Sequence, residues 1–311
     1  MTSTPSAHLT CLCGAISEPG TLLKDDRFPT SASICHCNSC RRTSGSLGAS
    51  FPPLKSPPPE ATLSRLTAYH SSDIITRYFC SKCGCHCFIF HHPRKKWYCL
   101  GGVVEPSPSP EAHNVSGPKN TIQVSLHEYV SDTLDGGLAP LFHNLGGRFI
   151  PIYTAAPGSA EIAYDTTLSS LKESVNSTPP PAVNSCLPAK CHCGGVSLLI
   201  KRANYESSTA AESARYIPSD PTKWLSYFCT CRSCRLSFGV SLTPWTLVLP
   251  AHVFNASGVV EGSSKAELVP VVFDRQAASP DANPGLTLKH YWSSPDVCRT
   301  FCGKCGASVS Y

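Results

Sequence analysis

The sequence predicts a mainly β protein with few short helices, built from two tandem copies of one cysteine-rich module. Short apolar runs of the strand type are common, at residues 88–90, 122–126, 196–200 and 242–249, whereas helix-period apolar patterns are scarce. Charged residues make up only 15% of the chain and prolines number 28, a composition that disfavours long helices. A length of 311 residues suits about two domains.

Three cysteine clusters recur in the same order in both halves of the chain, with the spacings C-x-C, C-x-C-x2-C and C-x2-C-G. The cysteines are Cys11, Cys13, Cys35, Cys37, Cys40, Cys80 and Cys83 in the first copy, and Cys191, Cys193, Cys229, Cys231, Cys234, Cys302 and Cys305 in the second. Residues 69–84 and 291–306 also share nine of sixteen positions. The pattern therefore indicates a tandem duplication.

The duplication suggests the domain boundaries. We expect a first domain at residues 8–150, a Pro/Ser/Ala-rich linker at residues 151–188 and a second domain at residues 189–311. The second copy is longer between its last two clusters, and residues 256–285 suit a surface insertion. Its sequence stops five residues after Gly306, so either the second domain is truncated at its C-terminus or the first domain donates the missing strands. We expect an incomplete strand at residues 309–311 and a second domain that is the less stable half.

The number and setting of the cysteines favour metal binding. The chain has 19 cysteines, residues 1–10 lack the basic and apolar regions of a signal peptide, and no apolar run approaches the ~18 residues of a membrane span. We therefore expect a cytoplasmic protein, with the nucleus as an alternative, that makes no membrane contact. Clustered cysteines in such compartments are more often metal ligands than disulfides.

Seven thiols per module divide naturally as four plus three, because tetrahedral Zn²⁺ takes four ligands. The outer pairs of each copy can close a four-cysteine structural site, formed by Cys11, Cys13, Cys80 and Cys83 in the first copy and by Cys191, Cys193, Cys302 and Cys305 in the second. Gly84 and Gly306 follow the second pair, where a tight turn is expected to bring backbone amides toward the sulfurs. The prediction is two Zn²⁺ per domain and up to four per chain.

The middle cluster of each copy supplies the other three thiolates and leaves one zinc position open, as catalytic zinc sites do. These open sites are predicted at Cys35, Cys37 and Cys40 and at Cys229, Cys231 and Cys234. Two alternatives remain from the spacing: a fourth protein ligand closes the site, or all seven sulfurs share one cluster.

The run at residues 35–45 (CHCNSCRRTSG) and the run at residues 79–84 (FCSKCG) resemble the family of glutathione-dependent formaldehyde-activating enzymes and centromere protein V. The second copy shares the resemblance at residues 291–306. The resemblance implies a β-rich, zinc-ribbon-like fold and the four-plus-three division of thiols. It also implies a zinc-dependent carbon–sulfur lyase-type activity that joins glutathione and formaldehyde as S-hydroxymethylglutathione.

The implied chemistry suits an open thiolate site, because a substrate thiol in the fourth zinc position loses its proton. Arg41 and Arg235 follow the third ligand of each copy and are candidates to pair a carboxylate of the thiol substrate, although ordinary surface arginines would look the same. Phe238 replaces the small Ser44, so we expect a narrower second site.

The repeat also separates shared from unshared groups. We predict that His36 and the thiols without a counterpart bind no metal; these thiols are Cys85, Cys87, Cys99, Cys186 and Cys298. The formal charge of +5 gives no support for nucleic-acid binding, because fourteen thiolates and four Zn²⁺ together add −6 and leave about −1. The alternative to an enzyme is a non-catalytic zinc module that binds a thiol carrier or a protein partner.

Overall fold

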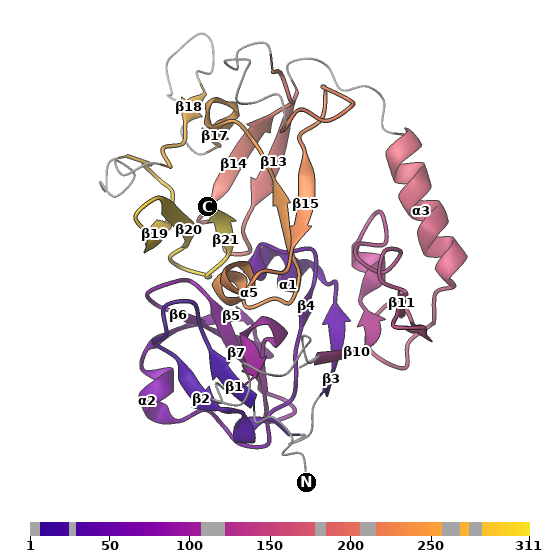
Figure 1. The fold of residues 1–311 in the computed structure, drawn as a ribbon, viewed down its shortest axis with the longest axis vertical. Helices are drawn as coiled ribbons and strands as arrows, with labels where there is room; N and C mark the ends of the chain where they lie inside the picture. Colours follow the sequence, from indigo (N-terminus) through magenta and orange to yellow (C-terminus); the bar gives the residue numbers. More distant parts are fainter. Residues whose placement is uncertain are drawn as a thin grey trace, which may run out of the picture.

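The computed structural model describes residues 7–24, 29–106, 122–177, 185–205, 216–256, 268–273 and 282–311. These residues form many short β-strands in small sheets and a few helices, which confirms the mainly β prediction (Figure 1). In Figure 1 the first module lies in the lower half and the second in the upper half, with helix α3 to one side.

Three sheets build the first module, with strand orders β2-β1-β9, β10-β3-β4 and β5-β6-β7-β8. Their strands are β1 (Ala7–Thr10), β2 (Ser17–Pro19), β3 (Thr30–Cys35), β4 (Ala49–Ser50), β5 (Leu66–Ser72), β6 (Ile75–Cys80), β7 (His86–His91), β8 (Lys96–Cys99), β9 (Val104–Pro106) and β10 (Ile122–Glu128). Strand β10 runs parallel to β3 and places Glu128 opposite Cys35. The predicted runs at residues 88–90 and 122–126 therefore lie in strands.

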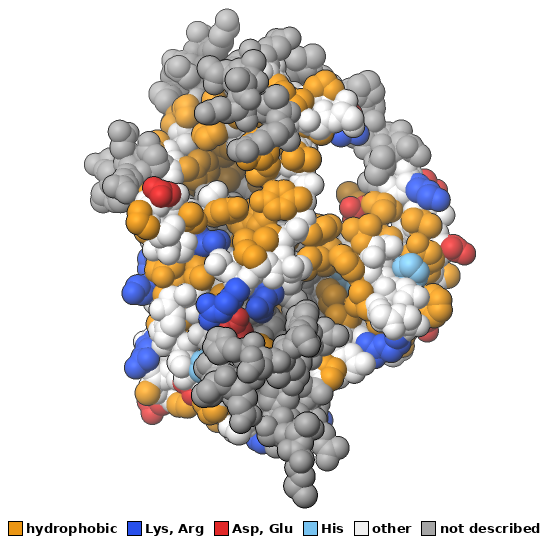
Figure 2. All heavy atoms as spheres, in the orientation of Figure 1, with side chains coloured by type: hydrophobic (Ala, Val, Ile, Leu, Met, Phe, Trp, Pro, Cys, Tyr) orange, Lys and Arg blue, Asp and Glu red, His pale blue; other side chains and the backbone are white. Residues whose placement is uncertain are grey.

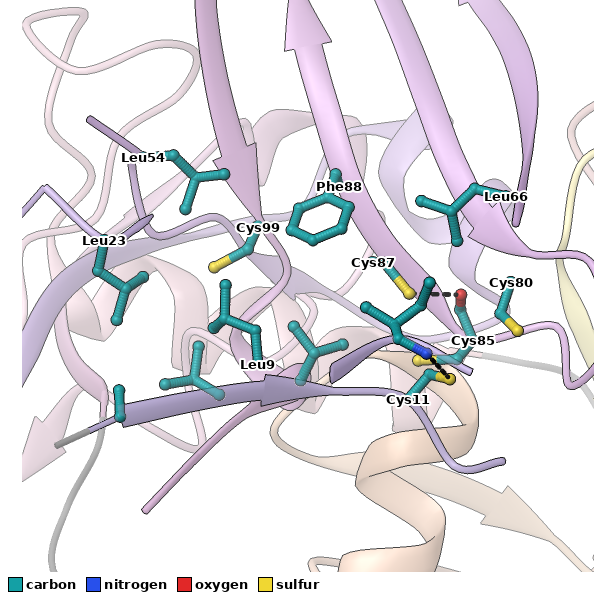
Figure 3. Packing of buried hydrophobic residues seen from close by; sticks show 14 of the residues in the cluster. Leu9, Cys11, Leu23, Leu54, Leu66, Cys80, Cys85, Cys87, Phe88 and Cys99 are labelled. Carbon is teal, nitrogen blue, oxygen red and sulfur yellow. Dashed lines mark hydrogen bonds between the residues drawn. The ribbon is translucent and has the colours of Figure 1, made fainter. Parts of the chain in front are cut away.

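The core of the first module lies between β1 and the meander β5-β6-β7-β8. Leu9 and Phe88 are fully buried there, and the thiols of Cys85, Cys87 and Cys99 lie in the same cluster (Figure 3). Burying a side chain of the size of leucine or phenylalanine contributes about 1.5–3 kcal/mol. This packing fixes the C-terminal end of β1 near the C-terminal end of β6, and each end leads into a cysteine pair.

In the described residues the helices are short, except for α3. They are α1 (Asn38–Ser44), α2 (Glu60–Leu63), α3 (Tyr164–Ser177) and α5 (Arg232–Phe238), with single 3₁₀ turns η1 (Gly20–Leu22), η2 (Gly101–Val103), η4 (Val130–Asp132) and η6 (Pro250–His252). Helix α3 lies inside the segment that composition assigns to a linker, and Ile152 is buried with Val130 and Ala139. Part of that segment is therefore folded, because a few apolar side chains suffice to anchor a Pro/Ser/Ala-rich stretch.

The second module repeats the same kinds of sheet. Besides its three sheets, the first module ends with the hairpin of β11 (Asn144–Leu145) and β12 (Arg148–Phe149). The strands of the second module are β13 (Cys186–Lys190), β14 (Ser197–Lys201), β15 (Ser226–Cys229), β16 (Thr243–Thr246), β17 (Val253–Asn255), β18 (Val269–Pro270), β19 (Leu288–Ser294), β20 (Val297–Cys302) and β21 (Ser308–Ser310). The sheets have the orders β13-β14-β17-β18, β15-β16 and β19-β20-β21. Strand β21 occupies the predicted C-terminal strand position, whereas most of the predicted insertion at residues 256–285 lies outside the described residues.

A cavity opens in the second module. Figure 2 shows hydrophobic side chains gathered over the part of the molecule that carries β13, β14 and β15. A cavity of about 1150 Å³ opens there, and its lining includes Trp224, Tyr227, Trp245 and Tyr311. Side chains at the wall of a cavity lack contacts on one side, so this module gains less packing energy than a filled core provides.

The two modules pack against each other through matched contacts. The amide of Leu12, inside the first C-x-C pair, donates to Leu236 O of α5 at 3.2 Å. In the reverse direction the amide of His192, inside the second C-x-C pair, donates to Arg42 O of α1 at 3.1 Å. Leu236 and Arg42 hold the same position in the repeat, so the contacts are related by a pseudo-two-fold arrangement, with α1 and α5 at the module boundary (Figure 1).

Candidate metal centres

The outer cysteine pairs of the first module meet in one cluster. Cys11 and Cys13 lie in the turn after β1, while Cys80 ends β6 and Cys83 follows in the next turn. Their four sulfurs lie within 4.8 Å of one another, and Cys13 Sγ is 3.6 Å from both Cys11 Sγ and Cys80 Sγ. Gly84, after the second pair, has φ +78°, which confirms the tight turn that favours glycine.

The second module forms the matching cluster from Cys191, Cys193, Cys302 and Cys305. Cys193 Sγ lies 3.5 Å from Cys191 Sγ and from Cys302 Sγ. Gly306 again has φ +78°. The two four-thiol clusters therefore have the same construction, as the duplication predicts.

The sulfur separations fit a tetrahedral metal ion. Zinc–sulfur bonds of about 2.3 Å place the ligands of a tetrahedron about 3.8 Å apart. The observed separations of 3.5–3.6 Å are close to that edge length. A disulfide would need about 2.05 Å, and all 19 cysteines are free. The four-thiol clusters can thus hold metal ions of the zinc type.

Backbone amides lie close to these sulfurs, as the turn chemistry suggests. Ile16 N donates to Cys11 Sγ at 3.4 Å, and Val196 N donates to Cys191 Sγ at 3.2 Å. The amide of Gly84 instead donates to Cys80 O at 2.9 Å and closes its own turn. Amide donors from the turns after the C-x-C pairs therefore stabilise thiolate charge.

The middle cysteines of the first module form a separate three-thiol cluster. Cys35 ends β3, Cys37 caps α1 and Cys40 lies in the first turn of that helix. Their sulfurs lie within 4.8 Å of one another, and Cys37 Sγ accepts a hydrogen bond from Cys40 N at 3.3 Å. The strand-to-helix turn therefore brings three thiols close enough together to bind one metal ion.

The second module contains the same turn with greater exposure. Cys229 ends β15, Cys231 caps α5 and Cys234 lies in its first turn. The three sulfurs again lie within 4.8 Å, but the Cys231 residue is exposed whereas Cys234 is buried. In both modules the four-thiol and three-thiol groups are distinct clusters in the described part of the chain, so the arrangement does not support one shared seven-sulfur cluster.

Arg77 on β6 is a neighbour of the first three-thiol cluster that the cysteine spacing did not reveal. It is only 5% exposed, and its Nη2 donates to Cys40 Sγ at 3.3 Å. Its counterpart Arg299 on β20 is 7% exposed. The signal was present in the repeat, because the two arginines are among the residues that residues 69–84 and 291–306 share.

A buried histidine pair supports the first cluster from the side of β10. His36 Nε2 lies 3.0 Å from His127 Nδ1, and His127 Nε2 lies 3.1 Å from Phe142 O. Since Phe142 O can only accept, His127 carries its proton on Nε2 and Nδ1 accepts from His36. Burial, with a smaller effect from His127, lowers the pKa of His36 to about 3, so the pair is neutral at pH 7. The hydrogen bond between His36 and His127 thus connects the thiol-bearing turn to β10. It does not involve a sulfur atom.

Glu128 is a second neighbour that sequence reasoning missed. It lies opposite Cys35 across the β10-β3 pairing, and residues opposite one another in a sheet face the same side. Its carboxyl accepts a hydrogen bond from Ser33 Oγ at 2.9 Å. Burial raises the pKa of Glu128, an effect that the hydrogen bond from Ser33 partly offsets. The first cluster therefore has a carboxyl group nearby whose pKa lies above its ordinary value.

The two arginines predicted to pair a substrate carboxylate have protein partners. Arg41 donates to His36 O at 2.9 Å and to Asp132 O at 2.8 Å. Arg235 forms an ion pair with Glu105 of β9 in the other module at 3.2 Å. Both contacts tie a thiol-bearing turn to another element. A role in substrate binding stays a prediction for both residues.

Phe238 is buried and packs against Trp245, with ring centroids 5.1 Å apart. Val240 of the second module and Ala49 of the first module belong to the same small core. The predicted narrowing of the second site by Phe238 stays a prediction. Trp245 and Phe51, which each lie eleven residues after the third cysteine of the middle cluster in their copy, both pack against this core.

The unshared thiols lie outside all four clusters in the part of the chain that the structure describes. Cys85, Cys87 and Cys99 are completely buried in the core of the first module (Figure 3). Burial raises the pKa of the Cys99 thiol, so it behaves as a small apolar side chain. Cys186 and Cys298 are half-buried on β13 and β20.

The fold and these clusters define a mainly β chain whose thiols can hold metal ions. Residues 6–113 match the family model described as glutathione-dependent formaldehyde-activating enzyme, which confirms the resemblance for the N-terminal part of the chain. The match includes all seven shared cysteines of the first module, whereas the relation of the second module rests on the internal repeat. No curated protein and no solved structure matches the chain. Among the described residues, no helix is long and apolar enough to span a membrane.

Proposed function

We propose that the chain is a zinc-dependent carbon–sulfur lyase-type enzyme that joins a small thiol, such as glutathione, to formaldehyde. The observation that carries this proposal is the separation of three thiols from four in a module that matches the formaldehyde-activating family. The four-thiol clusters suit structural zinc, and the three-thiol clusters suit zinc with one exchangeable position. We accordingly propose up to four Zn²⁺ per chain, two in each domain.

The first module is the proposed reaction centre. Cys35, Cys37 and Cys40 would hold the Zn²⁺ ion, which would supply an open position and a positive charge that favour the thiolate form of a substrate thiol at neutral pH. The substrate sulfur then forms a bond to the formaldehyde carbon, the carbonyl π bond breaks and the oxygen takes a proton. The thiol proton is lost and one proton is gained, so the S-hydroxymethyl adduct forms without a redox change.

Glu128 is the proposed proton source at this site. Its position opposite Cys35 and the raised pKa of its half-buried carboxyl support this role. Arg77 and the neutral His36–His127 pair hold the surrounding turn in place. For Arg41 to pair a carboxylate of the substrate, its hydrogen bonds to His36 O and Asp132 O would have to break when the substrate binds.

The experiment compares adduct formation from glutathione and formaldehyde by exchange NMR, above the uncatalysed rate, for the full chain and three variants. Cys40→Ser is expected to remove catalysis and about one metal ion while the thermal transition stays near that of wild type. Cys234→Ser, the matched change in the second module, is expected to remove one ion but keep most of the rate. Glu128→Gln should keep the metal and lower the rate by about 10²-fold or more. Full activity in Cys40→Ser would refute the assignment.

A non-catalytic role is the second candidate, and it applies best to the second module. Cys231 is exposed, and the nearby Tyr227 and Phe228 on β15 are 38% and 40% exposed. Exposed aromatic groups beside a metal site suit a module that binds a thiol carrier or a protein. If neither module accelerates adduct formation with any small thiol while metal content is complete, this candidate is favoured.

The proposed location is the cytoplasm, with the nucleus as the alternative. Support comes from the 19 free thiols, which a reducing compartment preserves. The charge of about −1 for a fully metal-loaded chain supports a small-molecule partner rather than nucleic acid. Fractionation of cells that express a tagged form of the full chain would test the location.

A further inference from the structure

Arg77 places a buried positive charge against the first three-thiol cluster. Its Nη2 donates to Cys40 Sγ at 3.3 Å, its Nε donates to Ser71 Oγ at 2.9 Å, and its guanidinium lies 5.9 Å from the centre of the Phe51 ring. No carboxylate forms an ion pair with Arg77 among the residues that the structure describes. A guanidinium this far from water needs an anion, and the thiolates are the anions that it faces.

The second module offers a natural comparison, because its equivalent arginine makes a different contact. Arg299 donates through Nε to Ser293 Oγ at 3.2 Å, as Arg77 does to Ser71. Its Nη1, however, donates to Ser237 Oγ at 3.2 Å, and the guanidinium lies 5.1 Å from the Tyr311 ring centre. The same residue of the repeat therefore contacts a neutral hydroxyl in the second module and a sulfur ligand in the first.

We propose that Arg77 is a positioning residue that makes the first three-thiolate site select an anionic fourth ligand, a thiolate, while the second site lacks this selection. The inference rests on the proposed function, because it requires a metal ion on the three thiols. Three thiolates and one Zn²⁺ carry a charge of about −1, and a fourth thiolate makes it about −2. A buried guanidinium beside Cys40 offsets one of these charges, and its charge-assisted hydrogen bond strengthens as negative charge accumulates.

Two other charged residues near this turn in the described part of the chain, Arg41 and Glu128, do not supply this compensation. Arg41 donates instead to backbone oxygens of His36 and Asp132 and to the side chain of Asn38. Glu128, opposite Cys35, is an acid and has no positive charge that could offset a second thiolate. Arg77 is therefore the cation that accounts for acceptance of a thiolate at this site.

The test uses the full-length chain loaded with Co²⁺, whose sulfur charge-transfer absorption reports a new thiolate ligand without any turnover. Cys231→Ser is included in every sample so that the second three-thiol site does not contribute. Glutathione serves as the anionic ligand and imidazole as the neutral one. The four-thiolate Co²⁺ spectrum in the same samples reports whether each variant is folded.

Arg77→Met is expected to weaken glutathione binding by about tenfold to a hundredfold and to leave imidazole binding within about twofold. Arg77→Lys should recover part of the glutathione affinity, because it keeps the charge but not the forked donors. Arg299→Met, the matched control, should leave glutathione binding at the first site unchanged.

Two results would overturn the inference alone: equal glutathione affinity in Arg77→Met and wild type, or an equal loss of glutathione and imidazole. The first would show that the charge has no effect, and the second would show a purely structural role. Failure of the parent chain to bind Co²⁺ at Cys35, Cys37 and Cys40 would overturn the proposed function together with the inference. If Arg77→Met loses the four-thiolate spectrum, Arg77→Gln decides the question, because it keeps a polar side chain without the charge. A ratio of glutathione to imidazole affinity equal to that of wild type in Arg77→Gln would then overturn the inference.

Discussion

At the scale of single residues, His86 links the packing between modules to pH. It is fully buried on β7, with its ring centroid 5.7 Å from that of Phe79, and Gly239 and Gly306 of the second module approach it closely. Burial, with a further contribution from the positive charge of Arg77, lowers the pKa of His86 to about 4. The side chain is therefore neutral in the folded protein, whereas it titrates near 6.5 when unfolded.

The unfolded chain binds more protons at this histidine than the folded chain does, so stability falls as the pH falls from about 6.5 toward about 4. Between pH 7.5 and pH 5.5 the expected loss is roughly 1–2 kcal/mol for this one group. His86→Gln removes the titration and should flatten the profile by that amount. Urea unfolding of both proteins at the two pH values, with excess zinc, measures the difference. Parallel profiles would show that His86 does not control acid stability.

At the scale of structural elements, the four-thiol clusters join strands that are distant in the sequence. In the first module the cluster connects the end of β1 to the end of β6, which the packing of Leu9 and Phe88 already brings close. Structural zinc sites contribute about 10–16 kcal/mol of apparent binding energy. Domain stabilities are only about 5–15 kcal/mol, so the metal decides whether such a module is folded.

Cys80→Ser is therefore expected to abolish the cooperative melting transition of the first module and to lower the metal content by at least one ion. Differential scanning calorimetry and elemental analysis measure the two effects. Cys40→Ser, which belongs to the three-thiol cluster, is the matched control and should melt close to wild type. Similar melting of Cys80→Ser and wild type would exclude a structural metal at this position.

The thiols that the two modules do not share should bind no metal. Cys85, Cys87 and Cys99 fill apolar space, so replacement by alanine is the suitable change and should lower stability slightly through lost packing. Cys186 and Cys298 are half-buried and tolerate serine. The five replacements together should leave the metal content of the wild type. A lower content, measured by elemental analysis of the folded protein, would show that the duplication is an unreliable guide to the ligands.

The cysteine spacing predicts much of this arrangement because each turn is local. C-x-C and C-x2-C fit single turns, and the three-thiol cluster spans one strand-to-helix turn, so short spacing alone brings these sulfurs together. The contacts of Arg77 and Glu128 were not predictable in this way, because they depend on how β6 and β10 pack against that turn. Helix α3 was missed because its composition, rich in serine and threonine, resembles that of a linker.

At the scale of the whole molecule, each module supplies part of the support for the other's three-thiol turn. Gly45 at the end of α1 packs against Ser308 of β21, and Gly239 at the end of α5 packs against His86 of β7. Phe79 and Phe301 meet between the modules with ring centroids 6.4 Å apart, and both are buried. Separate expression of the two halves would expose this surface, so the stability of either half alone underestimates its stability in the chain.

Two glycines of the second module allow this coupling to be tested without cutting the chain. Gly306 and Gly194 each follow a cysteine pair, with φ of +78° and +74°. An alanine at either position bears a left-handed backbone cost of about 1 kcal/mol. A Cβ at Gly306 would also lie 2.6 Å from the Phe79 ring of the first module, whereas a Cβ at Gly194 meets nothing within 4 Å.

Gly306→Ala should therefore lower the free energy of unfolding by about 1–3 kcal/mol more than Gly194→Ala does, because only the first change overpacks the boundary between modules. The loss of stability should also reach the first module, because Phe79 lies on β6 directly before Cys80. Thermal melting, together with the rate at which a chelator removes metal from Cys11, Cys13, Cys80 and Cys83, measures both effects. If the two alanine variants melt alike and release first-module metal at the same rate, the modules fold independently and the matched contacts between them carry no coupling.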